Sequence, residues 1–207
     1  MGNQSGKAYG LTVLCPLRSD AHEKQSFSAA VRARLHALPL DEDSPMARVP
    51  NTYLCRLFVL DDVPYQGEPA QSEHLKSKYL VFVCELHGQL ETYLQGMWKN
   101  AADMINSIWE FCVGFKDDVR DADTFTRYIK KCQVTTTFYF NGSTDEPLAE
   151  QLKALYLKQE FSKFVIANQG KSAAEVQRSF AEFVKATEPS NLAGPSWRPG
   201  ASRLDVA

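Results

Sequence analysis

The sequence lacks a long hydrophobic run, an excess of one charge and a close pair of cysteines. No apolar stretch approaches the roughly 20 residues that a membrane-spanning helix needs. Lys and Arg total 23 against 25 Asp and Glu, so there is no global basic field to hold nucleic acid or an anionic membrane surface. The composition therefore predicts no nucleic-acid partner and no membrane partner.

The five cysteines are scattered through apolar stretches, and none belongs to a C-x-x-C pair. Such a set indicates buried thiols in a reducing compartment rather than a disulfide framework. No Cys or His residues have the close spacing of a zinc site, so we predict no metal. The first ten residues lack the apolar stretch of a signal peptide, and we expect a cytoplasmic protein. The glycine motifs of dinucleotide-binding and P-loop proteins are absent, and the sequence identifies no cofactor.

Strand-like and helix-like segments together predict an α+β fold. β-branched and apolar residues indicate strands at 11–17, 52–60, 79–86 and 134–140. Apolar residues at helical spacing indicate helices at about 26–38, within 90–112 and after Asp121 or Asp123. Apart from the split second helix, this order is that of a ferredoxin-like four-stranded antiparallel sheet with helices on one face.

The chain divides into three expected parts. Residues 8–142 form the ferredoxin-like α+β domain, 143–187 a C-terminal helical extension, and 188–207 a disordered tail. In the extension, Pro147 is placed to open one helix, and Ser172 and Glu175 form a capping box that opens another. From Pro189 onward, Pro, Gly and Ser dominate and no periodicity remains.

Both faces of the predicted sheet carry apolar side chains. In strand 52–60, one face has Tyr53, Cys55, Leu57 and Val59, and the other has Leu54, Arg56, Phe58 and Leu60. An antiparallel sheet with one solvated face normally alternates apolar and polar residues, so both of these faces need cover. The cover is a second copy that completes a dimeric α+β barrel, the C-terminal helices, or a ligand in a cavity. We favour a homodimer with a partly open interior cavity, with cover by the C-terminal helices as the alternative.

Four residues on these strands or at their ends are candidate catalytic or binding residues. Arg56 either holds a carboxylate, phosphate or oxyanion, forms an ion pair with Glu85, or extends its charged end into solvent at a sheet edge. Asp61, beside Asp62, either performs acid–base chemistry or ends the strand and caps a turn. Glu85 is either a desolvated proton donor or a cross-strand partner. His87, at a strand end, is the best candidate among the four histidines.

Three stretches of the chain show a resemblance to a known family. They are 44–62 (SPMARVPNTYLCRLFVLDD), 78–94 (KYLVFVCELHGQLETYL) and 108–115 (IWEFCVGF). They resemble a family of uncharacterised bacterial proteins with a ferredoxin-like core, over about residues 44–135. Family members carry His where this chain has Tyr53, Phe111 and Cys132, so the resemblance implies that histidine-dependent chemistry or haem ligation lacks those residues here. The family brings no assigned reaction.

Three functions follow from these patterns. The first is a small-molecule-binding protein or enzyme that holds an apolar or aromatic compound in a sheet-lined cavity, with Arg56 as its polar anchor. The second is a non-enzymatic protein-interaction module that uses the C-terminal helices. The third and weaker one is a haem or redox protein. The sequence leaves these alternatives, and enzymatic activity itself, open.

Overall fold

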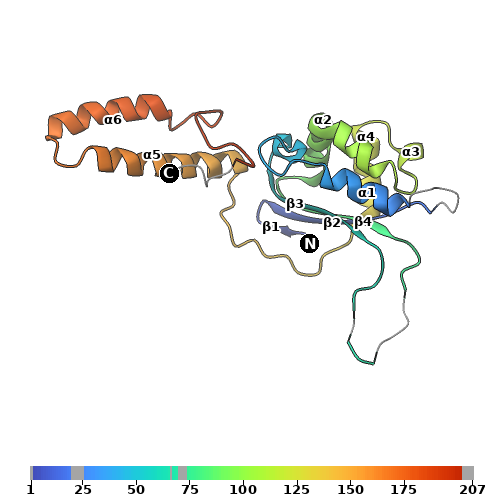
Figure 1. Cartoon of the computed structure of the whole chain (residues 1–207). Helices are drawn as coiled ribbons and strands as arrows, with labels where there is room; N and C mark the ends of the chain where they lie inside the picture. Colours follow the sequence, from blue (N-terminus) through green and yellow to red (C-terminus); the bar gives the residue numbers. More distant parts are fainter. Residues whose placement is uncertain (1, 20–25, 66, 70–73, 202–207) are drawn as a thin grey trace.

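A four-stranded antiparallel sheet forms the base of the molecule, and helices cover one of its faces (Figure 1). The computed structural model describes residues 2–19, 26–65, 67–69 and 74–201. The strands are β1 (Gln4–Ser5), β2 (Ala8–Pro16), β3 (Thr52–Leu60) and β4 (Tyr79–His87). The helices are α1 (Phe27–His36), the 3₁₀ turn η1 (Pro45–Arg48), α2 (Leu90–Trp109), α3 (Phe115–Asp118), α4 (Ala122–Cys132), α5 (Leu148–Ala167) and α6 (Ala173–Thr187).

The sheet order is β1-β2-β4-β3, and every neighbouring pair is antiparallel. The predicted α+β class and the four-stranded antiparallel sheet are therefore confirmed. On the helical side, α1 contacts β3, α2 contacts β4 and α4 contacts β2. The core between these layers is apolar and centres on Trp109, whose ring meets Phe82 and Phe125 edge-on, with centroids 5.6 and 6.3 Å apart.

The predicted strand at 134–140 is wrong, because these residues form no strand. Only the start of the segment pairs with β2, where the Val134 amide donates to the Thr12 carbonyl at 2.8 Å. Beyond that point the edge of β2 is already occupied by β1, which folds back through a turn at Gly6. Asn3 completes this edge, because its side chain bonds the carbonyl of Gly10 and the hydroxyl of Thr136.

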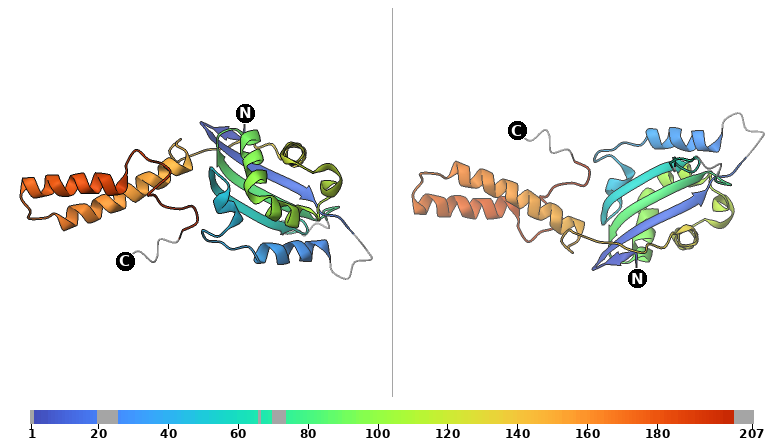
Figure 2. Two further views of the ribbon diagram at one scale, coloured as in Figure 1. Left: turned by 90° about the horizontal axis from the view of Figure 1, so that it is seen from above. Right: turned by 90° about the horizontal axis from the view of Figure 1, so that it is seen from below.

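None of the described helices crosses the second face of the sheet (Figure 2, right). On this open face Leu54 is 68% exposed and Phe58 is 44% exposed. The C-terminal helices do not cover it, so the alternative of cover by these helices is wrong. The open face instead has only local cover from residues near 139, as the next subsection describes.

The helices α5 and α6 form a hairpin that extends away from the sheet (Figures 1 and 2). Its two predicted start signals are confirmed: α5 begins directly after Pro147, and the Glu175 carboxylate accepts from the Ser172 amide at 2.9 Å. Residues 188–201 contain no helix or strand, and residues 202–207 lie outside the described part of the chain. The disorder of the tail stays a prediction, although Pro199 and Gly200 lie beside the loop that follows α1. Among the described helices, none is long and apolar enough to cross a membrane.

Candidate functional site

Two of the predicted site residues, Glu85 and His87, lie on the open face at one end of the sheet. Alternation along β4 sets both on the same face. The structure adds two tyrosines that the sequence did not indicate, Tyr53 beside His87 and Tyr139 beside Glu85. The four side chains form a polar cluster at the end of β4 that is nearest to the hairpin.

His87 has a defined hydrogen-bonding role in this cluster. The Tyr53 hydroxyl lies 2.8 Å from the Nδ1 of His87 and 2.8 Å from the Glu146 carbonyl. A carbonyl can only accept, so Tyr53 donates its single proton to Glu146 and accepts from His87. The neutral His87 ring therefore carries its proton on Nδ1, which leaves Nε2 as the acceptor. Burial, followed by the charges of Asp145 and Glu146, raises the pKa of Tyr53.

Glu85 is covered by Tyr139, whose ring packs directly on the backbone of Gly10. A Cβ atom at Gly10 would lie 2.9 Å from two ring carbons of Tyr139, so this close approach requires glycine. Burial, and next the Glu85 carboxylate, raises the pKa of Tyr139. The Glu85 Oε2 is buried and has no hydrogen-bond partner among the described residues.

Arg56 lies on the same open face, but its side chain is exposed. It is directly opposite Val83, while Glu85 is opposite Leu54. Arg56 makes no ion pair with a described carboxylate, so the predicted pairing with Glu85 is absent from a single chain.

Asp61 and Asp62 lie at the opposite end of β3, away from His87, and both stabilise the base of the loop between β3 and β4. Asp61 forms ion pairs with Arg32 and Lys78, which lower its pKa. Asp62 accepts from the Leu75 amide at 2.8 Å, and this bond is the largest cause of a pKa lowered to about 2. These are the interactions expected of carboxylates that end a strand and cap a turn.

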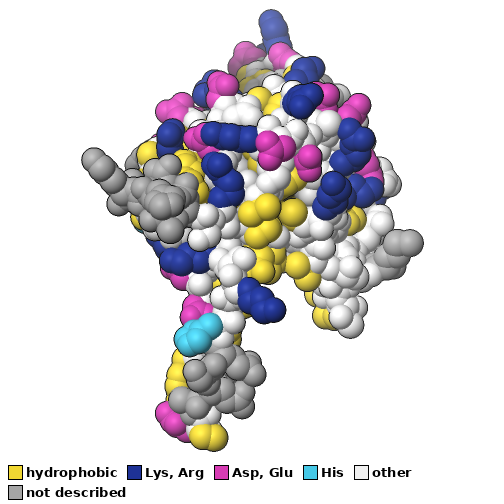
Figure 3. Space-filling model, turned by 90° about the vertical axis from the view of Figure 1, so that its right-hand side faces the viewer, with side chains coloured by type: hydrophobic (Ala, Val, Ile, Leu, Met, Phe, Trp, Pro, Cys, Tyr) yellow, Lys and Arg dark blue, Asp and Glu magenta, His cyan; other side chains and the backbone are white. Residues whose placement is uncertain are grey.

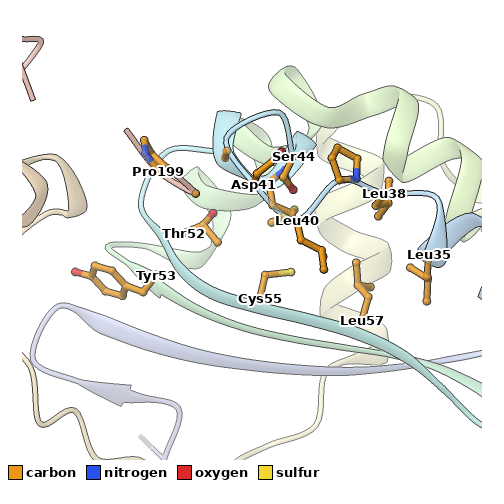
Figure 4. Close-up of a pocket in the computed structure, with 14 residues that line it drawn as sticks. Leu35, Leu38, Leu40, Asp41, Ser44, Thr52, Tyr53, Cys55, Leu57 and Pro199 are labelled. Atoms are coloured by element: carbon orange, nitrogen blue, oxygen red, sulfur yellow. The ribbon is translucent and has the colours of Figure 1, made fainter. Parts of the chain in front are cut away.

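A groove lies on the other side of β3, between this strand and α1 (Figure 4). We call it the β3 groove, and it has a volume of about 290 Å³. Cys55 and Leu57 point from β3 towards Leu38 and Leu40, and Pro199 lies at the far end (Figure 4). Its lining residues are Leu35, Leu38, Pro39, Leu40, Asp41, Ser44, Met46, Ala47, Thr52, Tyr53, Cys55, Leu57, Pro199 and Gly200.

The polar groups of the β3 groove already have partners in the chain. The Thr52 hydroxyl bonds the Val49 carbonyl and the Tyr93 hydroxyl, and the Ser44 hydroxyl accepts from the Met46 amide. Burial raises the pKa of the Cys55 thiol to about 12, so Cys55 is protonated at neutral pH and is not a nucleophile. The groove therefore suits an apolar compound better than a charged one.

The cysteines form two groups of free thiols. Cys55 and Cys84 are directly opposite each other on β3 and β4. Cys15 lies beside Cys112 and Cys132, and contact with Cys112 is the largest cause of its raised pKa. Across the described residues, no group of three or more His, Cys, Asp or Glu side chains could hold a metal ion.

The α5–α6 hairpin contains the largest set of exposed apolar side chains in the described structure. Phe161 and Phe164 of α5 contact Phe180 and Phe183 of α6, with ring centroids 5.3–5.9 Å apart. No residue from 154 to 186 is fully buried. The exposed apolar residues of the hairpin are Leu155, Phe161, Val165, Ile166, Phe180 and Val184.

The base of the hairpin is joined to the tail by Lys153. Its side chain is only 2% exposed, and its ammonium donates to the Thr187 carbonyl at 2.6 Å and the Pro195 carbonyl at 2.7 Å. Sequence reasoning missed this residue, because a lysine in a helix normally lies at the surface.

The chain matches no family model, and searches of curated proteins and of solved structures also find no match. Interpretation of the site therefore depends on its geometry. That geometry brings Glu85 and His87 together, places Arg56 apart on the same face, and places Asp61 at the far end of the sheet. The charged residues at the end of the molecule shown in Figure 3 are of both signs and are intermixed.

Proposed function

We propose that this protein is a non-enzymatic interaction module that presents the α5–α6 hairpin to another protein. The observation behind the proposal is that α5 has apolar residues on two sides and contacts a helix on only one. Phe161 and Phe164 contact α6, whereas Leu155 and Ile166 remain 40% and 71% exposed. An apolar stripe on a helix normally packs against another element. Burial of the exposed parts of these two side chains removes apolar surface from water, which favours a partner on this side.

The test is site-specific photo-cross-linking in the native cells. A benzoylphenylalanine replaces Leu155 or Ile166, and the matched control replaces Arg178, an exposed residue of α6. We expect Leu155 and Ile166 to cross-link to the same protein and Arg178 to give no such adduct. The absence of adducts at both α5 positions, or equal adducts at all three, would contradict the proposal.

A second candidate function is binding of a small apolar or aromatic compound in the β3 groove. Its support is the groove volume of about 290 Å³ and the apolar lining, whose few polar groups already have partners. This groove uses the side of β3 opposite Arg56, so the anchoring role first expected of Arg56 has no support there. The cluster of Glu85, His87, Tyr53 and Tyr139 stays a candidate catalytic site without an assigned reaction.

A neutral fluorescent naphthylamine tests the β3 groove. Leu40 is 95% exposed, so Leu40→Glu should not disturb folding, and it places a charge over the apolar lining. We expect this variant to weaken probe binding about tenfold, while Arg56→Ala leaves binding unchanged. If Arg56→Ala weakens probe binding and Leu40→Glu does not, the probe binds on the open face, where Arg56 lies, and not in the β3 groove.

The expected homodimer, with a ferredoxin-like sheet completed into an α+β barrel, also stays part of our proposal. Its support is the open face, where Leu54 and Phe58 are exposed and where Arg56 and Glu85 lack charged partners among the described residues. A face-to-face pair would bury Leu54 and Phe58 of both copies. Leu54→Arg should convert such a dimer to a monomer in sedimentation velocity, and an unchanged sedimentation coefficient would contradict it.

The third function, a haem or redox protein, receives the least support. The resemblance to the uncharacterised bacterial family points to the positions of Tyr53, Phe111 and Cys132. Tyr53 lies near the His87 end of the sheet, whereas Cys132 contacts Cys15, which pairs with Leu80 near the other end. These positions do not converge on one site.

A further inference from the structure

The side of α5 that faces away from α6 has the residue spacing of a coiled-coil seam. Residues on this side recur at alternating intervals of four and three, which keeps one stripe of a helix facing a partner helix. The members of this stripe, which we call the α5 seam, are Leu148, Leu152, Leu155, Gln159, Ser162 and Ile166. Leu155, Ser162 and Ile166 are exposed, whereas Leu148 and Leu152 are half-buried and line a pocket with residues 192–199. At 3.6 residues per turn, the α5 seam lies on the side of α5 opposite Phe161 and Phe164, which pack on α6.

The charged positions beside the α5 seam are basic. Lys158 flanks it on one side and Lys163 on the other, and both are exposed. Lys163 forms an exposed ion pair with Glu160 at 2.8 Å, three residues away on α5. Glu150 and Glu160 lie more than a quarter-turn from the seam and do not flank it. A helix that docks here therefore meets two lysines at its borders.

These charges disfavour a second α5 as the occupant. In a parallel pair of helices, the position of Lys158 in one copy faces that of Lys163 in the other. In an antiparallel pair, each flank faces the identical flank of the other copy, so Lys158 opposes Lys158, or Lys163 opposes Lys163, when the pair is centred on that residue. Like charges at such positions destabilise the pairing, whereas opposite charges select a partner.

We propose that the α5 seam binds an amphipathic helix of a different protein, with an aliphatic stripe bordered by Asp or Glu. This inference rests on the proposed interaction function and names the chemistry of the partner. The aliphatic stripe covers Leu155 and Ile166, and the acidic borders pair with Lys158 and Lys163. Gln159 sets the register, because a buried amide needs a polar residue opposite it.

Two synthetic helical peptides test this chemistry on the full-length chain. They share one leucine seam with a single Asn and differ only in the flanking positions, which are Glu in one and Lys in the other. By fluorescence anisotropy we expect the Glu peptide to bind about tenfold more tightly or better, with an affinity that falls as salt rises. The double variant Lys158→Glu/Lys163→Glu should reverse this preference.

Seam variants and a matched control locate the binding surface. Leu155→Glu and Ile166→Glu should abolish binding of the Glu peptide, and circular dichroism should show an unchanged fold because both side chains are already exposed. Arg178→Glu, on the outer side of α6, should leave binding unchanged. Equal affinity for the two peptides, or binding that survives both seam variants, overturns the proposal.

Other occupants would give distinct results. Self-association that Ile166→Glu removes in sedimentation velocity would identify a second copy. Co-sedimentation with phosphatidylserine vesicles that the same variant removes would identify a membrane surface. Either result overturns the acidic helix. Cross-linking from Leu155 and Ile166 without a preference for the Glu peptide refutes only the partner chemistry, whereas no cross-linked protein at all refutes the interaction function itself.

Discussion

Replacement of Gly10 by Ala tests whether Tyr139 covers the open face of the sheet. The added Cβ would lie 2.9 Å from Cδ2 and 2.9 Å from Cε2 of Tyr139, so the ring must move. Overpacking of this kind costs about 1–3 kcal/mol. A Gly-to-Ala change also stabilises by about 0.4–1 kcal/mol, because it restricts the unfolded chain. We therefore expect Gly10→Ala to lower the free energy of unfolding by about 1–2 kcal/mol.

Gly10→Ala should no longer lower the free energy of unfolding once the Tyr139 ring is absent. In a Tyr139→Ala background the contact is lost, so Gly10→Ala should be neutral or stabilising by up to about 1 kcal/mol. Urea unfolding of the wild type, both single variants and the double variant gives the coupling free energy between the two positions. We expect a coupling free energy of about 1.5–3 kcal/mol between positions 10 and 139. An equal effect of Gly10→Ala in both backgrounds would refute the packing of Tyr139 on β2.

A spectroscopic measurement on the same variants separates this contact from a general loss of stability. Burial and the Glu85 carboxylate raise the pKa of Tyr139. If Gly10→Ala displaces the ring, that pKa should fall towards its usual value, and the alkaline absorbance titration near 295 nm should shift to lower pH. Wild type and variant should titrate alike only if the ring stays in place.

Three further predictions concern Cys55, Asp62 and Lys153. Because the pKa of Cys55 is raised from 9.0 to about 12, its alkylation by iodoacetamide at pH 8 should be about a thousandfold slower in the folded protein than in urea. Similar alkylation rates in the two states, measured by mass spectrometry, would contradict the burial of Cys55. Asp62 has a lowered pKa, so its contribution to loop stability is present above about pH 4 and is lost as pH falls through about 2. The NMR shift of the Leu75 amide should titrate near pH 2 in the wild type and should not titrate in Asp62→Asn. A midpoint near pH 4 would count against the hydrogen bond between Asp62 and the Leu75 amide. Lys153→Met removes two charge-assisted hydrogen bonds, so hydrogen exchange of α6 should accelerate in line with a loss of about 3 kcal/mol, with Lys158→Met as the matched control that should show little change.

Local signals in the sequence predicted most elements correctly. The strand predicted at 52–60 coincides with β3, and β4 extends one residue beyond the predicted 79–86, because long β-branched and apolar runs have few other stable conformations. The exceptions are β1, which was not predicted, and 134–140, whose composition is equally strand-like. Strand formation needs a free edge, and residues 3–5 occupy the one on β2. The residues within 134–140 alone do not show that residues 3–5 compete with them for the edge of β2.

The candidate site was predictable only in part, for a related reason. Glu85 and His87 share a face because side chains alternate along a strand, and that rule needs only their spacing. Tyr53 and Tyr139 lie beside Glu85 and His87 because each contacts backbone that is distant in the sequence. Tyr53 contacts the Glu146 carbonyl, and Tyr139 packs on Gly10. Asp61 directly follows β3, the strand that carries Tyr53, but it lies at the opposite end of that strand, beside Arg32 and Lys78.

The sequence alone determined the α+β class, the two main sheet strands and the starts of the C-terminal helices, because short-range periodicity and capping decide these features. Tertiary structure decided what lies against each surface. It placed the core helices on one face of the sheet, left Leu54 and Phe58 exposed on the other, and directed α5 and α6 away from both. The seam on α5 shows the difference: its spacing can be read from the residues, but only the packing of Phe161 and Phe164 on α6 shows which side of the helix remains open.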